Sequence, residues 1–483
     1  MQKNTAINVP KFFLQYDRPL FWISSIVAIL FFLSAIYFEK YLLFVIPFAL
    51  AFCTLVLLNF RFVFYFMLVV LPVSVETYIG DYGTDLPSEP LVVLLAAAAF
   101  LFLLVPANKK HFKLFQHPII IVFSLLFLWS LFVLLFSTDV FLSIKYILAK
   151  AWYLLCFLIL PILLIKDKKS FQNFFWCLFI PTFLSVVYIM IRHGLMQFTF
   201  DSITPAVHPI YRNHVNYAVF ITMLLPFIFL ARTWYSKEML RYKLLTFAIF
   251  LFLLAIYFSY TRGAWLAVFA MFFYYVVLRL NLTKYLLIVA AIVVIGFTAY
   301  ILKDNNYLKF APNYETTIYH DDLTDHLSST FEMEDMSTVE RFYRWIAAIK
   351  LFKDHPMVGV GPNNFVSNYK QYTVTAYETY ISENEERSTV HNYFLLLLAE
   401  QGLPAMLLFI ALIVSILITA QYVFNVADDT NKNYIVALTL CIVAFLLNNT
   451  LSDLVEANKV GSLFLMSIGL LINFSNRTIS IQD

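Results

Sequence analysis

The chain has 483 residues, of which 61% are hydrophobic and only 13% are charged. Soluble globular domains carry about 25% charged residues, so this composition excludes a soluble globular protein. The formal net charge of +3 is too small to indicate a nucleic-acid partner. Apolar runs of about 20 residues recur along the chain, and each is long enough to cross a lipid bilayer. The composition therefore predicts an all-α, polytopic integral membrane protein.

The apolar runs predict 12–14 transmembrane helices, a range that reflects how closely the early runs follow one another. In chain order, the predicted spans are 19–38, 41–60, 62–79, 88–106, 118–137, 143–165, 171–191, 213–231, 243–260, 263–280, 284–302, 392–424, 433–449 and 459–475. The first run lacks a small-residue cleavage site after it, so we read it as a retained span rather than a signal peptide. Three domains are expected: a bundle of about eleven spans in residues 1–302, a polar loop in 303–390, and C-terminal spans in 391–483.

Lysine and arginine are concentrated in alternate connections between the predicted spans. These basic connections carry Arg61; Lys109, Lys110 and Lys113; Lys166, Lys168 and Lys169; Arg232, Lys237, Arg241 and Lys243; Arg279 and Lys284; Lys432; and Arg477. By the positive-inside rule they face the cytoplasm, and both termini are then cytoplasmic. The large loop lies on the outer face, together with Arg212, Arg262 and His391.

The outer loop contains one clearly marked helix. Ser337-Thr338-Val339-Glu340 is a capping-box pattern, which is typical of a helix start. Apolar side chains then recur at helical spacing until Pro356 and the turn Gly359-Val360-Gly361-Pro362. We expect this helix to lie along the membrane surface with its aromatic side toward the bilayer. The two glycines lack the third glycine and the preceding strand of a dinucleotide-binding loop, so they indicate a tight turn.

Arginines from three outer segments fall near one membrane level. Arg262 sits at the tip of a hairpin between two spans, and Arg212 precedes another span. Arg341 and Arg344 lie one turn apart on the loop helix. A guanidinium suits phosphate because its planar donors engage two oxygens at once, so one group with two linked phosphates would explain all three segments. The alternatives are that Arg262 reaches toward lipid phosphates and that the loop arginines form a solvated face.

His391 directly precedes a predicted span, with Asn392 beside it. The span continues through Glu400-Gln401-Gly402-Leu403-Pro404, which contains polar residues that a lipid-facing helix would avoid. A neutral imidazole is a natural base for deprotonating a hydroxyl group. A single histidine at a membrane surface is also commonly an ordinary polar residue, and position alone favours His391. The competing histidines are His208, His214, His320 and His326.

No pattern in the sequence calls for a metal ion or another cofactor. Asp321, Asp322 and Asp325 could be a cation cluster, but their acidic loop is better explained as a solvated surface. The four cysteines all fall within apolar runs without a CxxC pattern, so packing is their expected role. Lys145, near the outer end of the sixth span, either faces the same site as the arginines or reaches to the membrane surface.

Three motifs follow one another in the second half of the chain. The first is Thr261-Arg262-Gly263-Ala264-Trp265, and the second combines Arg341 and Trp345 with residues 354–365. The third is His391-Asn392-Tyr393, with Glu400-x-Gly402-Leu403-Pro404 after it. In order and spacing, the region from Arg212 to the C-terminus resembles the bacterial O-antigen ligase and O-antigen polymerase superfamily.

The resemblance implies an α-helical, metal-independent, inverting glycosyltransferase of the C-type class. It would take a glycan from undecaprenyl pyrophosphate and transfer it to an acceptor hydroxyl on the periplasmic face of the bacterial inner membrane. By position, Arg262 and Arg341 match the family arginines that hold the pyrophosphate, and His391 matches the proposed base. Arg212 is a looser match. Arg344 is expected at the pyrophosphate too, with Asn392, Trp345 and Lys145 as possible supporting residues.

The resemblance leaves the acceptor open. The acceptor is the lipid A core for a ligase, another lipid-linked repeat unit for a polymerase, and a protein hydroxyl for an O-oligosaccharyltransferase. One dominant outer loop, rather than two comparable loops, favours the ligase. A polysaccharide flippase or other transporter is the alternative outside the enzymes. Such a protein is expected to show paired half-repeats and charges near the bilayer midplane, whereas here the charges gather at one face.

Overall fold

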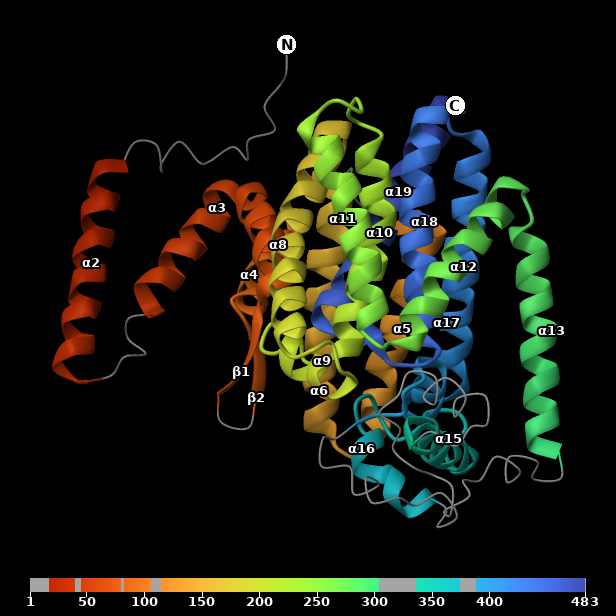
Figure 1. The fold of residues 1–483 in the computed structure, drawn as a ribbon. Helices are drawn as coiled ribbons and strands as arrows, with labels where there is room; N and C mark the ends of the chain where they lie inside the picture. The colour runs from red at the N-terminus through yellow and green to blue at the C-terminus, as the bar shows by residue number, and fades with distance from the viewer. Residues whose placement is uncertain are drawn as a thin grey trace.

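The structure is a computed structural model that describes residues 17–39, 45–79, 82–105, 114–303, 336–373 and 388–482. Figure 1 shows long helices packed side by side, with a smaller group of elements around α15 and α16 at one end. Within the described residues, ten helices are long and apolar enough to cross a membrane. Three shorter apolar helices accompany them: Ser25–Tyr37, Asn59–Val73 and Ser88–Leu104. The predicted all-α polytopic membrane fold is therefore confirmed.

The elements follow one another in this order. The N-terminal part contains α2 (Asp17–Tyr37), α3 (Val45–Val70), β1 (Val75–Ile79), β2 (Tyr82–Leu86), α4 (Ser88–Leu104), α5 (Pro118–Val133), α6 (Val140–Tyr153), a π-helical turn (Leu154–Ile159), α7 (Leu160–Leu164), α8 (Lys168–Leu195), α9 (Phe200–Val207), α10 (His214–Arg232), α11 (Leu240–Phe258), α12 (Arg262–Arg279) and α13 (Thr283–Leu302). The loop contributes α15 (Met336–Asp354) and α16 (Phe365–Asn368), and the C-terminal part is α17 (Tyr393–Val426), α18 (Asp429–Asn449) and α19 (Asn458–Gln482).

Helix α3 contains the junction between two predicted spans. Asn59 has a non-helical backbone (φ −151°, ψ 67°), and its side-chain oxygen accepts a hydrogen bond from the Phe62 amide at 3.2 Å. Arg61 donates to the Leu164 carbonyl at 3.4 Å, at the end of α7. The second part of α3 then leads to a short 3₁₀ turn, Leu71–Val73. The chain thus breaks where the sequence predicted a basic connection.

The predicted span 62–79 extends too far, because its last residues form a β-hairpin. β1 pairs antiparallel with β2, with Val75 opposite Leu86 and Ile79 opposite Tyr82. Pro72 interrupts the helix, and the segment after it alternates the β-branched residues Val75, Thr77 and Ile79, which favour a strand.

The bundle has two chemically different ends. The connections after α10, α12 and α17 carry basic residues that include Arg232, Lys237, Arg279, Lys284 and Lys432. In Figure 1 these connections lie at the opposite end of the bundle from α15 and α16. We call the two ends the basic end and the loop end. Lys109, Lys110 and Lys113 lie outside the described residues.

Helices α10 and α19 form the centre of the bundle, and α13 stands at its edge. The apolar windows of α10 and α19 are 78% and 89% buried, whereas that of α13 is 6% buried. Figure 1 shows α2 and α13 on opposite sides of the bundle, each set apart from it. An apolar helix with so little burial is suited to contact lipid along its length.

The predicted loop helix is confirmed as α15, although its buried face packs on protein. Tyr343, Ala347 and Leu351 are buried, and α15 contacts the first part of α17. Phe342 and Trp345 are half-buried, with ring centroids 5.3 Å apart. The capping-box side chains before Glu340 lie outside the described residues, as do residues 304–335 and 374–387 of the predicted loop domain.

The turn after α15 is joined to α17 by main-chain hydrogen bonds. Gly402 (φ 75°, ψ −177°) breaks α17, and Pro404 has no N–H for the Glu400 carbonyl. The freed Ala399 and Glu400 carbonyls accept instead from the amides of Val360 (3.1 Å) and Gly361 (2.8 Å). The Leu403 amide, which a continuous helix would direct to Ala399, donates to the Pro356 carbonyl at 3.0 Å. The loop turn therefore completes the broken helix.

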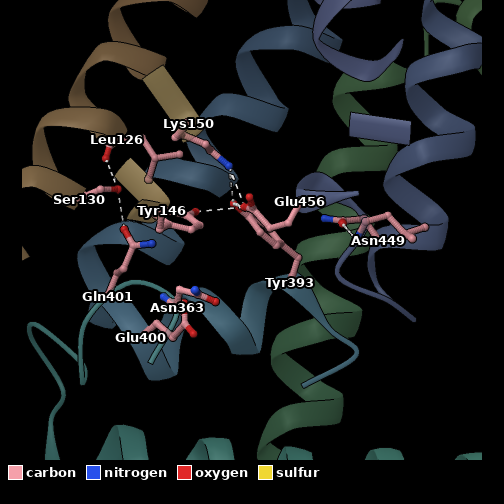
Figure 2. Close-up of polar contacts among 11 residues, drawn as sticks. Leu126, Ser130, Tyr146, Lys150, Asn363, Tyr393, Glu400, Gln401, Asn449 and Glu456 are labelled. Carbon is pink, nitrogen blue, oxygen red and sulfur yellow. Dashed lines mark hydrogen bonds and ion pairs between the residues drawn. The ribbon is translucent and has the colours of Figure 1, made fainter. Parts of the chain in front are cut away.

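Side chains strengthen the same junction. The Glu400 carboxylate accepts from the amides of Asn363 (2.8 Å) and Phe365 (3.0 Å), and Figure 2 shows Glu400 beside Asn363. Ser130 on α5 donates to the Gln401 side-chain oxygen at 2.7 Å. Glu400 and Gln401 are 5% and 1% exposed. The expectation that this part of α17 avoids lipid is therefore confirmed.

Asn364 joins the loop turn to the connection between α5 and α6. Its side-chain oxygen accepts from the Asp139 amide at 3.0 Å, and its side-chain nitrogen donates to the Ser143 hydroxyl at 2.8 Å. Ser143 in turn donates to the Pro362 carbonyl at 2.7 Å. The turn is thus fixed to two separate parts of the bundle. Because α15 directly precedes the turn, its C-terminal end is fixed as well.

We predict that Gly359→Ala destabilises the fold. Gly359 has φ +63°, and an added Cβ would lie 2.3 Å from the carbonyl carbon of Glu400. A strained backbone of this kind costs about 1–3 kcal/mol, and separation of the turn from α17 would add to that cost. Thermal unfolding of the purified protein in detergent measures the loss.

The matched control is Gly296→Ala on α13, where an added Cβ meets nothing within 4 Å. Alanine in a helix interior is favoured over glycine by about 0.5–1 kcal/mol, so this variant should be as stable as the wild type or slightly more so. Equal unfolding temperatures for the two variants would show that the turn does not depend on the close approach at Gly359.

Candidate active site

The first and third sequence motifs both contact the end of α18 or the connection that follows it, residues 450–457. An added Cβ at Gly263 would lie 2.8 Å from the Asn448 side-chain oxygen at the end of α18. Asn392 donates from its side chain to the Thr450 carbonyl at 3.0 Å. His391 Nδ1 lies 3.8 Å from Asp453 Oδ1. This connection is therefore the common support of the candidate site.

Arg262 is the first residue of α12, and its neighbours fix where the helix begins. Tyr260 has a left-handed backbone (φ 55°), and its hydroxyl donates to the Phe198 carbonyl at 2.6 Å. Trp265 donates to the Ile256 carbonyl at 2.8 Å. Gly263 allows α12 to approach α18 closely. The half-buried Arg262 is thus held at the loop end by contacts of its neighbours with the α8–α9 connection, α11 and α18.

His391 lies close to the Asp453 carboxylate and near the arginines of α15. Its backbone is left-handed (φ 56°), and a third of its side-chain surface is exposed. Burial, followed by the positive charges of Arg344 and Arg341, lowers the pKa of His391 to about 3. The imidazole is therefore neutral near pH 7. Both loop arginines are close enough to His391 to act on its charge.

The two loop arginines differ in their surroundings. Arg344 is 4% exposed and pairs with Glu340 at 3.1 Å, one turn earlier on α15. Its Nε is buried without a hydrogen-bond partner among the described residues. Arg341 is only half-buried. The loop helix thus directs one guanidinium inward beside a carboxylate and leaves the other partly open.

Asn392 has a clear structural role. Its side-chain oxygen caps α17 by accepting from the amides of Phe394 (3.0 Å) and Leu395 (3.1 Å). With its bond to Thr450, Asn392 ties the start of α17 to the end of α18. It therefore holds the backbone next to His391.

Arg212 and Lys145 are both exposed. Arg212 follows Tyr211, whose side chain is buried. The Lys459 ammonium lies over the Tyr211 ring, 4.4 Å from the ring centroid. Lys459 also donates to the carbonyls of Ile210 and Ser74, the latter at 2.8 Å. The backbone before Arg212 is thus anchored to α19, whereas the Arg212 side chain is exposed.

Three charged residues at the site were missed by sequence reasoning: Asp453, Glu456 and Lys150. Lys150 on α6, rather than the predicted Lys145, forms an ion pair with Glu456 at 2.8 Å. Asp453 accepts a hydrogen bond from the Thr389 hydroxyl, and burial raises its pKa above the usual value. One sequence feature could have pointed to Asp453 and Glu456. They are the two acidic residues of an eight-residue connection between spans, which directly follows the polar pair Asn448-Asn449.

The other candidates from the sequence are not brought to this place. His208 is exposed, and His214 Nδ1 lies 3.0 Å from the Thr204 hydroxyl. His320, His326, Asp321, Asp322 and Asp325 lie outside the described residues. Among the residues that the structure describes, no three His, Cys, Asp or Glu side chains form a group that could hold a metal ion.

We predict that Gly263→Ala destabilises the contact between α12 and α18 and that Asn448→Ala relieves part of the effect. The new Cβ would overlap the Asn448 side-chain oxygen, and overpacking of this kind costs about 1–3 kcal/mol. Unfolding temperatures of the two single variants and the double variant form a double-mutant cycle. Strictly additive effects would contradict a direct contact between the two positions.

Comparison with known families matches residues 247–410 to the O-antigen ligase family. The match begins within α11 and ends within α17, so it includes Arg262, α15, the loop turn and His391. It is shorter than the resemblance predicted from Arg212 to the C-terminus. A comparison with curated proteins returned no match. The chain is thus a multi-pass membrane protein whose residues 247–410 match the O-antigen ligase family.

Proposed function

We propose that the protein transfers a glycan from undecaprenyl pyrophosphate to an acceptor hydroxyl, and that this reaction is O-antigen ligation to the lipid A core. The observation that carries the proposal is the proximity of His391 to Asp453 and to the arginines of α15, with the start of α12 packed on the end of α18 and the connection after it. This arrangement can hold an anionic leaving group beside a neutral base.

The proposal places the loop end in the periplasm and the basic end in the cytoplasm of a bacterial inner membrane. Its support is the concentration of lysine and arginine in the connections of the basic end. Residues 1–302 then form an N-terminal membrane bundle, 303–390 a periplasmic domain, and 391–483 the C-terminal membrane helices. The reaction occurs at the periplasmic surface, where the polyprenyl tail remains in lipid and the diphosphate meets the arginines.

In the proposed donor complex, Arg262 and Arg341 bind the pyrophosphate. Guanidinium groups form paired hydrogen bonds with phosphate oxygens, and prearranged cations stabilise the charge that develops on a leaving group. Arg344 adds positive potential while it remains paired with Glu340. Arg212 provides a further cation at the same end, and Trp345 supports the arginine face of α15. These side chains supply the positive charge that a metal ion supplies in other transferases.

The transfer itself is an in-line displacement at the anomeric carbon. Asp453 faces His391 Nδ1 and favours a proton there, which leaves Nε2 to accept the proton of the acceptor hydroxyl. The acceptor oxygen forms a bond to the anomeric carbon as the bond from that carbon to pyrophosphate breaks. The bonding electrons leave with the pyrophosphate, next to the arginines. Attack from the face opposite the leaving group inverts the anomeric configuration.

The low pKa of free His391 fits an order in which the donor binds first. Burial lowers this pKa most, and the charges of Arg344 and Arg341 lower it further. A bound pyrophosphate would offset those charges and raise the basicity of the imidazole. Because a general base works best when its pKa lies near the working pH, the donor would prepare the base for the acceptor hydroxyl.

Ligation and polymerisation can be separated in a deletion strain. We predict that removal of the gene leaves the lipid A core without attached polymer, because the ligase acts on the finished chain. Gel analysis of the lipopolysaccharide tests this. A core that carries a single repeat unit would instead identify a polymerase, and an unchanged lipopolysaccharide with unglycosylated proteins would identify a protein glycosyltransferase.

We predict that Arg262→Ala and Arg341→Ala each lower transfer by about 10²–10³-fold, the usual effect of removing one stabilising donor. His391→Ala should lower it by about 10²–10⁴-fold, the range for a positioned base. The assay uses purified protein with lipid-linked glycans and core glycolipid extracted from the source cells.

The control variant is Arg279→Ala, which removes an arginine of the basic end whose Nε donates to the Tyr275 hydroxyl at 3.1 Å. It should retain wild-type transfer. Near-normal transfer by both Arg262→Ala and Arg341→Ala would rule out the donor site, and full activity of His391→Ala would assign the base to another residue.

A further inference from the structure

A cluster of polar side chains lies directly beside the candidate active site. Glu456 Oε1 accepts from Lys150 (2.8 Å), the Tyr146 hydroxyl (3.0 Å) and the Tyr393 hydroxyl (3.3 Å). Lys150 also donates to the Tyr393 hydroxyl at 3.3 Å. We call these four residues the Glu456 cluster. Figure 2 shows Lys150 and Tyr146, from α6, directed toward Glu456 and the ring of Tyr393.

The cluster places a lysine within a membrane span, where simple packing would be served by an apolar residue, and pairs it with Glu456 from the connection between α18 and α19. Lys150 lies in the span 140–164, and its side chain is 18% exposed. A lysine inside a span is costly and marks a functional position when it is paired and faces the protein interior. Replacing such a pair with apolar residues is commonly neutral for stability or favourable. Helix packing alone therefore does not explain Lys150.

The cluster joins the two chain segments that carry His391 and Asp453. Tyr393 lies two residues after His391, at the start of α17. Glu456 lies three residues after Asp453 and ends the short 3₁₀ turn Leu454–Glu456. Lys150 contacts both Tyr393 and Glu456 from a third element, α6. Its ammonium thus connects the backbone next to the base with the backbone next to the carboxylate.

His391 and Asp453 need such support, because neither is held within a regular helix. His391 has φ 56°, and Asp453 has φ −105° and ψ 60°. His391 Nδ1 and Asp453 Oδ1 are 3.8 Å apart, which is longer than a hydrogen bond. Asn449 fixes the beginning of the connection by accepting from the Leu454 amide at 3.1 Å. The Glu456 cluster fixes its end.

We propose that Lys150 is a positioning residue that, through Glu456 and Tyr393, sets the position of His391 relative to Asp453. The inference rests on the proposed function, because it assigns Lys150 to the same proton transfer. Lys150 does not itself contact the donor in this proposal. Its loss should therefore slow the chemical step without weakening donor binding.

The test compares Lys150→Met with Lys150→Arg. Methionine keeps the apolar stem and removes the ammonium, so we expect kcat to fall about 10- to 100-fold, the scale of a small displacement of catalytic groups. Binding of undecaprenyl pyrophosphate, measured directly on the purified protein, should change less than about twofold. Arginine can still pair with Glu456, so Lys150→Arg should recover most of the rate. The charge exchange Lys150→Glu with Glu456→Lys should recover part of it.

The matched control is Gln421→Leu, which removes a buried polar side chain from the other end of α17. Gln421 accepts from the Thr283 hydroxyl at 2.6 Å and donates to the Leu278 carbonyl at 3.0 Å. This variant should lose stability and keep its kcat. A Lys150→Met variant that loses stability and keeps its kcat in the same way would show that Lys150 has only a structural role.

The outcomes separate this inference from the proposed function. If His391→Ala is inactive while Lys150→Met and wild type have equal kcat, the positioning role is wrong and the base assignment stands. If Lys150→Met instead weakens undecaprenyl pyrophosphate binding in step with activity, Lys150 contacts the donor and the positioning role is again wrong. Full activity of His391→Ala would overturn the base assignment, and the role of Lys150 with it.

Discussion

The position of α15 and the turn after it depends on the break in α17 and on the main-chain hydrogen bonds that repair it. Unpaired backbone groups within a bilayer cost several kcal/mol each. Gly402 and Pro404 leave the carbonyls of Ala399 and Glu400 without helical partners, and Val360 and Gly361 supply the missing amides. Separation of the turn from α17 would leave these carbonyls unpaired. The hydrogen bonds therefore hold α15 and its arginines in a fixed position beside the bundle.

A second constraint places His391 near the same arginines. The connection between α18 and α19 receives α12 at Asn448, the start of α17 at Thr450 and His391 at Asp453. Each contact comes from a segment far away in the sequence. The candidate site is therefore a meeting point of helix ends, where residues are more exposed than in the spans and backbone direction changes sharply. His391 and Tyr260 use the left-handed region to make those changes.

The sequence predicted the features that depend on local pattern. A stretch of about 20 residues is enough to recognise each of three such features: the length of a span, the helical spacing of α15 and the polar residues at Glu400. The β-hairpin after Pro72 was missed because apolar strands and short apolar helices look alike in composition. Asp453 and Glu456 were missed because their partners lie more than 60 residues away. Lys145 was preferred over Lys150 because the sequence does not show which face of α6 points inward. Five residues turn a helix by roughly 500°, so the two lysines lie on different faces, and only the packing of α6 decides which of them faces inward.

The two arginines of α15 show why residue type alone does not assign a role. They lie one turn apart and carry the same charge, yet Arg344 is buried against Glu340 while Arg341 is partly open. A buried guanidinium with a carboxylate partner has little freedom to move toward a ligand, because separating the pair would leave a buried charge. Arg344 is therefore suited to hold α15 and to set the potential at His391. The half-buried Arg341 suits the proposed role at a phosphate, and with this division of roles one helix is both anchored to the bundle and, in the proposed function, available to the donor.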